Sequence, residues 1–149
     1  MIALIQRVSH ASVRIGERVS GAVDRGILAL VGVSRGDDAV AADRLLEKVL
    51  TYRIFPDADG RMNLSLRDIG GGLLLVPQFT LAADTRKGTR AGFSTAAAPE
   101  DATKLFSYLL AQAQALHQPV AAGEFGADMQ VSLTNDGPVT FWLETGTGT

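Results

Sequence analysis

The 149-residue chain has the composition of one globular domain, with 46% hydrophobic and 20% charged residues. A formal net charge of −2 argues against a general nucleic-acid binder, which is usually basic overall, but it is compatible with a local basic patch. The absence of cysteine excludes disulfides, thiolate metal sites and a cysteine nucleophile. No apolar run approaches the roughly 18 residues of a membrane span, and the first residues lack a secretion-signal pattern, so we expect a cytoplasmic protein without membrane partners.

The first third of the sequence predicts a sheet followed by a helix. Apolar and polar residues alternate through 1–15 and again through 19–23, which predicts one long strand, or two in series, and a hairpin. Residues 27–33 are apolar on both faces, as in a central strand that is buried on two sides. The segment 37–52 opens with two aspartates that can cap a helix and then repeats apolar residues every three to four positions, which predicts an amphipathic helix.

An apolar stretch in the middle of the chain changes character abruptly. Residues 73–76 predict a buried strand, and Pro77 then lacks the N–H that a sheet would use. Gln78 and Thr80 follow at strand period, so we expect both side chains on one face of a strand that runs to Leu81. Two interpretations are open: a polar edge strand that faces water, or a functional site, because local rules are commonly broken at such sites.

The loop 82–98 is long for a compact domain, and long loops tend to be functional. It holds a basic cluster of Arg86, Lys87 and Arg90. This cluster either solvates the surface or contacts a polyanion. Residues 99–116 then predict a second amphipathic helix, because a proline and two acidic residues stand at its start.

The C-terminal part of the chain predicts a hairpin. Residues 129–134 and 139–144 read as strands, and the Asn-Asp-Gly-Pro sequence of 135–138 reads as the turn between them. Because X–Pro bonds in folded proteins are seldom cis, the turn pattern alone favours a trans bond. We expect a single domain over 1–145 and a disordered tail over 146–149.

The side chains available for chemistry are few. The two histidines do not form an HxxxH zinc pattern, and no GxGxxG dinucleotide motif is present, so we expect neither a metal nor a cofactor. What remains is a site built from hydroxyls, amides and backbone groups, with Gln78 and Thr80 as the side-chain candidates. Thr80 is a weak nucleophile without a visible base. We therefore favour a positioning or oxyanion-stabilising role for this segment.

Several motifs together resemble the D-aminoacyl-tRNA deacylases, and the resemblance runs through almost the whole chain. It implies a mixed α/β fold in one domain, with barrel-like antiparallel and mixed sheets, two main outer helices and a homodimeric assembly. It implies hydrolysis of the ester that joins a D-amino acid, or glycine, to the terminal adenosine of tRNA. The matching segments are 1–8 (MIALIQRV), 52–55 (YRIF), 62–64 (MNL), 77–81 (PQFTL), 82–84 (AAD), 127–133 (ADMQVSL) and 135–140 (NDGPVT).

The resemblance also implies a chiral gate that comes from a second subunit. In the family a cis Gly-Pro dipeptide reaches into the partner's site, which carries over to Gly137 and Pro138. A rigid backbone wall beside Cα leaves room for hydrogen but not for an L side chain. Met129 is then expected near this gate, and Phe125 is expected to stack on or flank the terminal adenine.

The family's catalytic strand motif carries over to Gln78, Phe79 and Thr80. The family usually has serine before this motif, and this chain has Pro77, so no hydroxyl is available at that position. In the family's favoured picture, the terminal ribose 2′-OH of tRNA assists the chemistry. That picture agrees with the missing base in this sequence.

The remaining expectations concern the partners of the chain. The resemblance implies that Arg86, Lys87 and Arg90 contact phosphates at the 3′ end of an aminoacylated tRNA. An alternative interpretation is a nucleic-acid-binding homodimer without catalytic activity, in which Pro77 marks a lost site. A third is a dimer that binds small molecules and has no dependence on RNA.

Overall fold

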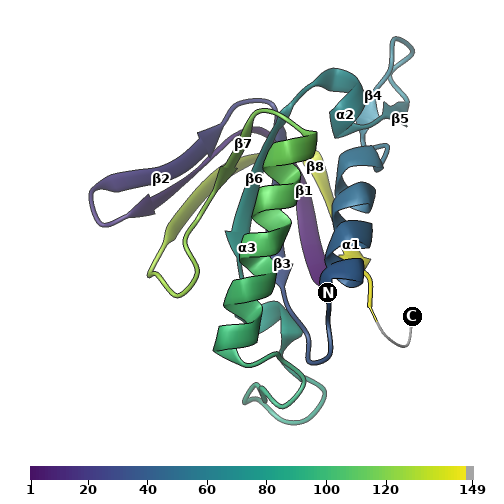
Figure 1. Ribbon diagram of the computed structural model, residues 1–149. Helices are drawn as coiled ribbons and strands as arrows, with labels where there is room; N and C mark the ends of the chain where they lie inside the picture. Colours follow the sequence, from purple (N-terminus) through teal and green to yellow (C-terminus); the bar gives the residue numbers. More distant parts are fainter. Residues whose placement is uncertain (147–149) are drawn as a thin grey trace.

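A long first strand organises the sheet (Figure 1). The computed structural model describes residues 1–146. In it, β1 (Ile2–Ile15) pairs antiparallel with β2 (Arg18–Val23), β3 (Gly26–Gly32) and β8 (Gln130–Glu144). One side of β1 is shared, since its first half pairs with β3 and its second half with β2, while β8 follows the other side. The alternating pattern of the N-terminus therefore supports a strand that is paired along both sides.

Two parallel strands complete the main sheet. β6 (Gly72–Pro77) pairs with β3, and β7 (Val120–Ala122) pairs with β6, giving the order β2-β1-β3-β6-β7. The hydroxyl of Ser20 on β2 donates to the carbonyl of Ala122 on β7 at 2.8 Å, which joins the two ends of this order. The sheet thus curves into a barrel-like form, and the predicted mixed α/β fold is confirmed (Figure 1).

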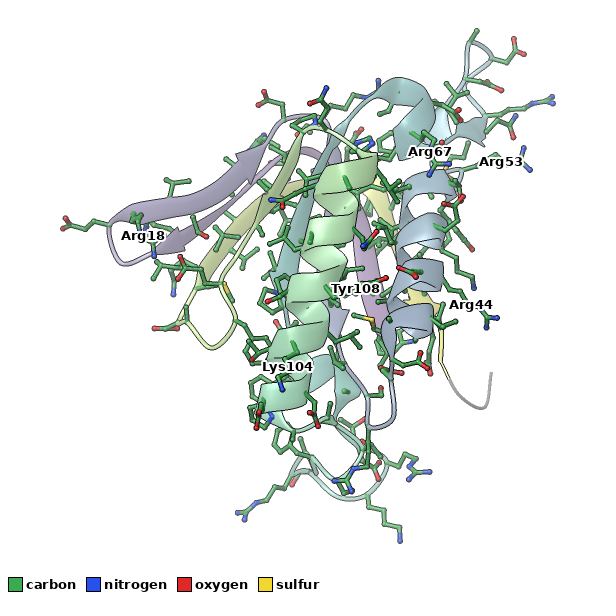
Figure 2. The ribbon with its side chains drawn as sticks, in the orientation of Figure 1. Arg18, Arg44, Arg53, Arg67, Lys104 and Tyr108 are labelled. Atoms are coloured by element: carbon green, nitrogen blue, oxygen red, sulfur yellow. The ribbon has the colours of Figure 1, made fainter. Side chains whose placement is uncertain are left out.

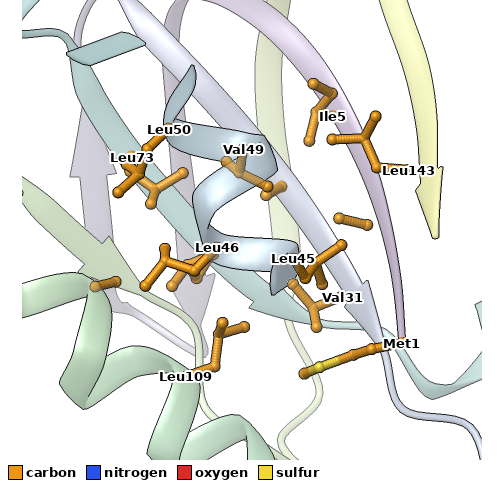
Figure 3. Packing of buried hydrophobic residues seen from close by; sticks show 14 of the residues in the cluster. Met1, Ile5, Val31, Leu45, Leu46, Val49, Leu50, Leu73, Leu109 and Leu143 are labelled. Carbon is orange, nitrogen blue, oxygen red and sulfur yellow. The ribbon is translucent and has the colours of Figure 1, made fainter. Parts of the chain in front are cut away.

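Two helices cover the outer face of the sheet. α1 (Ala39–Thr51) and α3 (Pro99–Leu116) lie beside each other along it, as Figure 1 shows. Asp38 caps α1 by accepting a hydrogen bond from the Ala41 N–H at 3.0 Å. Buried apolar side chains form a layer between these helices and the sheet. Truncating one leucine of this layer to alanine costs about 2–5 kcal/mol of folding free energy, so the layer holds the helices firmly to the sheet. Figure 3 shows part of it: Val31, Leu45, Leu46, Val49, Leu73 and Leu109.

Short elements fill the connections between the main ones. β4 (Phe55–Pro56) and β5 (Met62–Leu64) form a two-stranded sheet. α2 (Leu66–Ile69) follows, although no helix was predicted there. It forms because the Ser65 side chain accepts from the Asp68 N–H at 3.1 Å while the Asp68 carboxylate accepts from the Ser65 N–H at 2.8 Å.

The strand expected to continue to Leu81 ends earlier, at Pro77. The Gln78 N–H still donates to the Val31 carbonyl of β3 at 2.7 Å, but the Gln78 carbonyl accepts from the Leu81 N–H at 3.2 Å. This second bond turns the chain into the 3-10 helix η1 (Phe79–Ala82). The prediction that Gln78 and Thr80 share a strand face was therefore wrong.

The predicted C-terminal hairpin was also wrong, because β8 is one continuous strand that stays on β1. Val8 of β1 pairs with Asn135 and Gln6 pairs with Thr140, so residues 136–139 face the single residue Arg7. The Asn-Asp-Gly-Pro sequence forms a wide bulge in an edge strand rather than a turn between two strands.

The end of the last strand returns to the start of the chain. The Thr145 N–H donates to the Met1 carbonyl at 2.8 Å, and the Thr145 hydroxyl donates to the Ala41 carbonyl at 2.8 Å. Gly146 lies next to Asp37. The other residues of the expected tail, 147–149, lie outside the described part of the chain. Within residues 1–146, no helix is long and apolar enough to cross a membrane.

Candidate active site

A pocket of about 430 Å³ opens where β6 ends. It lies between η1, the first turn of α3 and the segment that leads into β8. Its walls are largely apolar, and among the described residues the one polar side chain in its lining is the uncharged amide of Gln78. The lining residues are Val33, Val76, Pro77, Gln78, Phe79, Ala97, Pro99, Ala102, Phe125, Gly126, Ala127, Met129 and Val131.

The pocket exists because β7 stops before β6 does. Leu73 donates to the Pro119 carbonyl at 3.0 Å and the Leu75 carbonyl accepts from Gly123 at 2.9 Å, so odd-numbered residues of β6 bond toward β7. Pro77 continues this series past the last residue of β7, Ala122. Its missing N–H therefore points to where no strand pairs with it. The proline costs no ladder bond and supplies a rigid apolar wall to the pocket.

The polar groups of the site lie at the rim of this pocket. Gln78 lines the pocket, and its side-chain amide donates to the hydroxyl oxygen of Thr80, which lies just outside the pocket lining. Because the Thr80 oxygen accepts in this bond, its own proton is available to a substrate oxygen. Phe79, between them, is 55% exposed. The rim thus offers hydroxyl and amide donors beside an apolar cavity.

Met129 and Phe125 form the wall opposite the rim. Gly123 lies beneath Met129, and a Cβ added to Gly123 would lie 2.6 Å from the Met129 sulfur. Only glycine at this position lets the methionine occupy its place without a shift. Phe125 is partly buried against the main core and lines the same pocket. The structure therefore brings Phe125 and Met129 together with Gln78 and Phe79.

The bulge that carries Gly137 and Pro138 is held by two side chains. Arg7 donates to the Asp136 carbonyl at 3.0 Å and to the Ile54 carbonyl at 2.7 Å, so it ties the bulge to the chain after α1. The Asn135 side chain accepts from the Val139 N–H at 3.0 Å and bridges the base of the bulge. No local sequence signal pointed to Arg7, since it occupies an ordinary position in an alternating strand.

The tip of the bulge is exposed backbone. The peptide bond between Gly137 and Pro138 is cis, and Gly137 has a φ of 139°. A Cβ on Gly137 would lie 2.7 Å from a methyl carbon of Val139 and 3.0 Å from the Val139 nitrogen. Both the backbone angle and the crowding restrict this position to glycine.

The bulge does not reach the pocket of its own chain. Val131, which lines the pocket, and Gly137 lie on the same strand, six residues apart. At about 3.3 Å per residue this is about 20 Å of strand. Met129 accordingly lies in the pocket and away from Gly137 and Pro138 within one chain, so these groups meet only if a second copy supplies one of them.

The basic cluster lies on the loop below α3 in Figure 1. Asp84 and Gly92 exchange backbone hydrogen bonds of 2.7 and 2.9 Å that close the loop. Arg86 donates to the Asp84 carboxylate at 2.9 Å, and these hydrogen bonds lower the pKa of Asp84 to about 2 and raise that of Arg86. Lys87 and Arg90 have no carboxylate partner among the described residues. Their charges are therefore available to a ligand, while that of Arg86 is partly neutralised.

One further motif tests an alternative site. Residues 32–36 read Gly-Val-Ser-Arg-Gly, the spacing of a nucleophile elbow, and run from the last residue of β3 into the loop before α1. The pocket of about 660 Å³ beside Ser34 is lined in part by Lys104 and Tyr108 (Figure 2) but by no histidine. Tyr108 donates to Asp43 at 2.9 Å, which raises its pKa and keeps the phenol protonated. Because neither histidine of the chain lines this pocket, the motif does not form a Ser-His-Asp triad.

Comparison with known proteins places the chain in a family. The family model described as D-Tyr-tRNA(Tyr) deacylase matches residues 4–144. A protein of Pseudomonas savastanoi pv. phaseolicola named D-aminoacyl-tRNA deacylase is 63% identical over 97% of this chain and 100% of its own length. A protein of the same name from Thioalkalivibrio sulfidiphilus is 64% identical over 97% of each chain.

Solved structures agree on the fold. One titled c-Myc DNA Unwinding Element Binding Protein has a TM-score of 0.93 at 37% identity and covers 99% of this chain and 100% of its own. A probable eukaryotic D-amino acid tRNA deacylase has a TM-score of 0.79 at 14% identity, over 96% and 98% of the two chains. At that identity the second likeness shows the fold alone.

These matches show that the chain is a hydrolase, an enzyme that uses water to cleave an acyl group from its substrate. The chain belongs to the D-Tyr-tRNA(Tyr) deacylase family, as its motifs predicted.

Proposed function

We propose that this chain hydrolyses the ester bond between a D-amino acid, or glycine, and the terminal adenosine of tRNA. The observation that carries the proposal is the apolar pocket with the Gln78 amide and Thr80 hydroxyl at its rim, in a chain of this family. In the proposed complex the aminoacyl group enters the pocket and the ester carbonyl lies at the rim. The basic loop is then on the side where the tRNA phosphates approach.

The reaction needs a nucleophile, and the rim offers no base to activate one. No histidine, lysine or carboxylate lines the pocket. Water therefore attacks the ester carbonyl carbon with help from the substrate's own ribose 2′-OH. The bond to the ribose 3′ oxygen breaks, that oxygen takes up a proton, and free amino acid and tRNA leave. Gln78 and Thr80 donate hydrogen bonds to the developing oxyanion, which commonly contributes about 100- to 1,000-fold in rate per donor.

The chiral selection is assigned to Gly137 and Pro138 of a second copy of the chain. The exposed bulge, whose base is fixed by hydrogen bonds, lies about 20 Å along the strand from the pocket of its own chain. A homodimer that places the bulge over the partner's pocket would bring the two features together. The backbone beside Cα then accepts hydrogen and excludes a side chain of L configuration. Overpacking costs about 1–3 kcal/mol or more, which excludes L substrates by one to two orders of magnitude. Glycine passes because it carries hydrogen on both sides.

The test is a comparison of D-Tyr-tRNA and L-Tyr-tRNA as substrates. The chain is expected to release tyrosine from the D substrate only, and glycine from Gly-tRNA. Equal rates on the two isomers, or release from neither, would contradict the proposal. Because the substrate is aminoacylated tRNA, we place the protein in the cytoplasm.

One observation favours a second candidate function, nucleic-acid binding by a homodimer without catalysis. The solved structure at 37% identity carries a title that names DNA binding. If this function applies, the chain binds tRNA ends and releases no amino acid from either isomer in the same assay.

A further inference from the structure

We infer that Phe79 and Phe93 form a stacking site for the base that precedes the terminal adenosine of tRNA. The two rings lie with centroids 5.4 Å apart and planes tilted by 41°. Phe79 is 55% exposed and Phe93 is 49% exposed. Among the described residues, the other ring pair is Tyr52 with Phe141, of which Phe141 packs against the core and Tyr52 is 38% exposed. Phe79 and Phe93 instead present a two-ring apolar surface to solvent.

The backbone holds both rings in place. η1 turns Phe79 outward directly after the pocket wall, and the Thr95 hydroxyl donates to the Ala82 carbonyl at 2.6 Å, joining the loop to the end of η1. The Arg35 N–H donates to the Thr95 carbonyl at 3.0 Å on the other side. Phe93 therefore stands between the Asp84–Gly92 closure and this second attachment. A pre-positioned ring loses little freedom when a planar ligand stacks on it.

The position and charge of this surface select the ligand. Phe79 lines the pocket, so the two-ring surface begins at the pocket's rim and continues outward toward the loop. The same loop carries the uncompensated charges of Lys87 and Arg90. Exposed rings beside cationic side chains are the usual means of binding single-stranded nucleic acid, because every base has a π-face and every nucleotide a phosphate. A purely apolar partner would provide no negative charge to pair with Lys87 and Arg90.

This inference rests on the proposed function, since it places the aminoacyl group in the pocket and the terminal adenosine at the rim. The next nucleotide in the 5′ direction then leaves the rim on the side of Phe93. The site therefore reads the unpaired end of tRNA as two nucleotides rather than one. A substrate that ends at the adenosine reaches the pocket but not the second ring.

The experiment compares D-Tyr-tRNA with D-tyrosyl-adenosine for the wild type and Phe93→Ala. The variant is expected to raise KM for D-Tyr-tRNA by about tenfold, since one base stack is worth about a factor of 5 to 150, and to leave kcat unchanged. Both constants for D-tyrosyl-adenosine should stay at wild-type values. Phe93→Tyr, which keeps the ring, should restore KM. Leu116→Ala, at a residue that is 59% exposed, is the control and should change neither substrate.

Two outcomes overturn the inference. One is an unchanged KM for D-Tyr-tRNA in Phe93→Ala, and the other is an equal loss on both substrates, which indicates a structural role. If the wild type hydrolyses neither substrate, the proposed function fails, and fluorescence anisotropy with uncharged tRNA decides the stacking site by itself. Weaker binding by Phe93→Ala than by Phe93→Tyr then supports it, and equal binding overturns it.

Discussion

The pocket and the bulge are opposite kinds of structure at two places along β8. The pocket is concave, is lined by apolar side chains, and takes its walls from β6, η1, α3 and the start of β8. The bulge is convex and is made of exposed backbone, with Arg7 and Asn135 holding its base. The pocket can receive a substrate side chain, whereas the bulge can only occupy a cavity in another molecule. Under the proposed function, the two together form the chiral site.

The comparison explains how a site with so few reactive groups can discriminate. Apolar side chains line the pocket, whereas hydrogen bonds fix the base of the bulge. In the proposed mechanism the donors at the rim set the rate, and the position of the bulge determines both how a D substrate fits and how an L substrate is excluded.

The largest effect is expected from Gly137→Ala. A Cβ at Gly137 meets Val139 at 2.7 Å, and a φ of 139° strains any other residue, so the bulge must change shape. A misplacement of about 1 Å can cost about 100-fold, so kcat/KM for D-Tyr-tRNA should fall by at least this factor. Gly60→Ala is the matched control. Its φ of 81° is also unfavourable but no atom lies within 4 Å, so it should lower Tm and leave kcat/KM unchanged.

A smaller effect is expected from Arg7→Ala, which releases the bulge without changing its sequence. The variant loses hydrogen bonds to the carbonyls of Asp136 and Ile54. Hydrogen bonds from a charged group are worth about 1.5–3 kcal/mol, so the ratio of D to L rates should fall by about tenfold or more. Arg14→Ala, at an exposed position of the same strand, should keep the wild-type ratio. An unchanged ratio in Arg7→Ala would show that the bulge needs no clamp.

The pocket itself is probed by Gly123→Ala. The added Cβ would lie 2.6 Å from the Met129 sulfur, and the flexible methionine should move into the pocket. Because the pocket narrows, kcat/KM should fall about three- to tenfold for D-Tyr-tRNA and less for D-Ala-tRNA, within the cost of about 1–3 kcal/mol for overpacking. Gly92→Ala, with its nearest neighbour at 3.8 Å, is the control. An equal loss on both substrates would count against a narrowed acyl pocket.

The smallest effect is expected from the ion pair of Asp84 and Arg86 on the basic loop. Hydrogen bonds from Arg86 lower the pKa of Asp84 to about 2, so the carboxylate stays charged at any assay pH near neutrality. Because the pKa of Asp84 is lowered in the folded chain, the ion pair with Arg86 contributes fully to folding stability above the ordinary pKa of a carboxyl group. That contribution is lost only as the pH falls toward 2. An NMR titration of the Asp84 carboxyl should give a midpoint near 2 in the wild type and a higher midpoint in Arg86→Ala. A midpoint in the ordinary range for the wild type would show that the pair is not formed in solution.

Local sequence patterns were sufficient for most elements of the fold. The alternation of β1, the doubly apolar β3 and the capped, periodic α1 follow rules that depend on neighbouring residues alone, and all three are present. The strand predicted to reach Leu81 ends early because a local hydrogen bond from Leu81 to Gln78 starts η1, whereas the hairpin error lies where a distant strand decides the outcome. Asn135 to Pro138 carry turn chemistry, but both flanks pair with β1, so the chain bulges instead of reversing.

The candidate site was predictable in its residue types and not in its geometry. Gln78 and Thr80 were selected because Pro77 interrupts an apolar run, and Phe79 was added by the motif resemblance. The pocket beside them depends on where β7 ends, 44 residues after Gln78. Phe93 and Arg7 carry no local signal, because their importance comes from partners far away in the chain. Motif resemblance supplied the role proposed for Gly137 and Pro138, which no periodicity could have indicated.

The most direct test of the account mixes two variants that are each inactive. Gln78→Ala removes a donor of the pocket rim, and Gly137→Ala deforms the bulge. If each site combines the pocket of one copy with the bulge of another, random mixing makes half of the dimers mixed, and each mixed dimer keeps one of its two sites. Unfolding and refolding the two variants together should then restore about a quarter of wild-type D-Tyr-tRNA deacylation. A mixture that stays as inactive as its components would contradict a site shared between two chains.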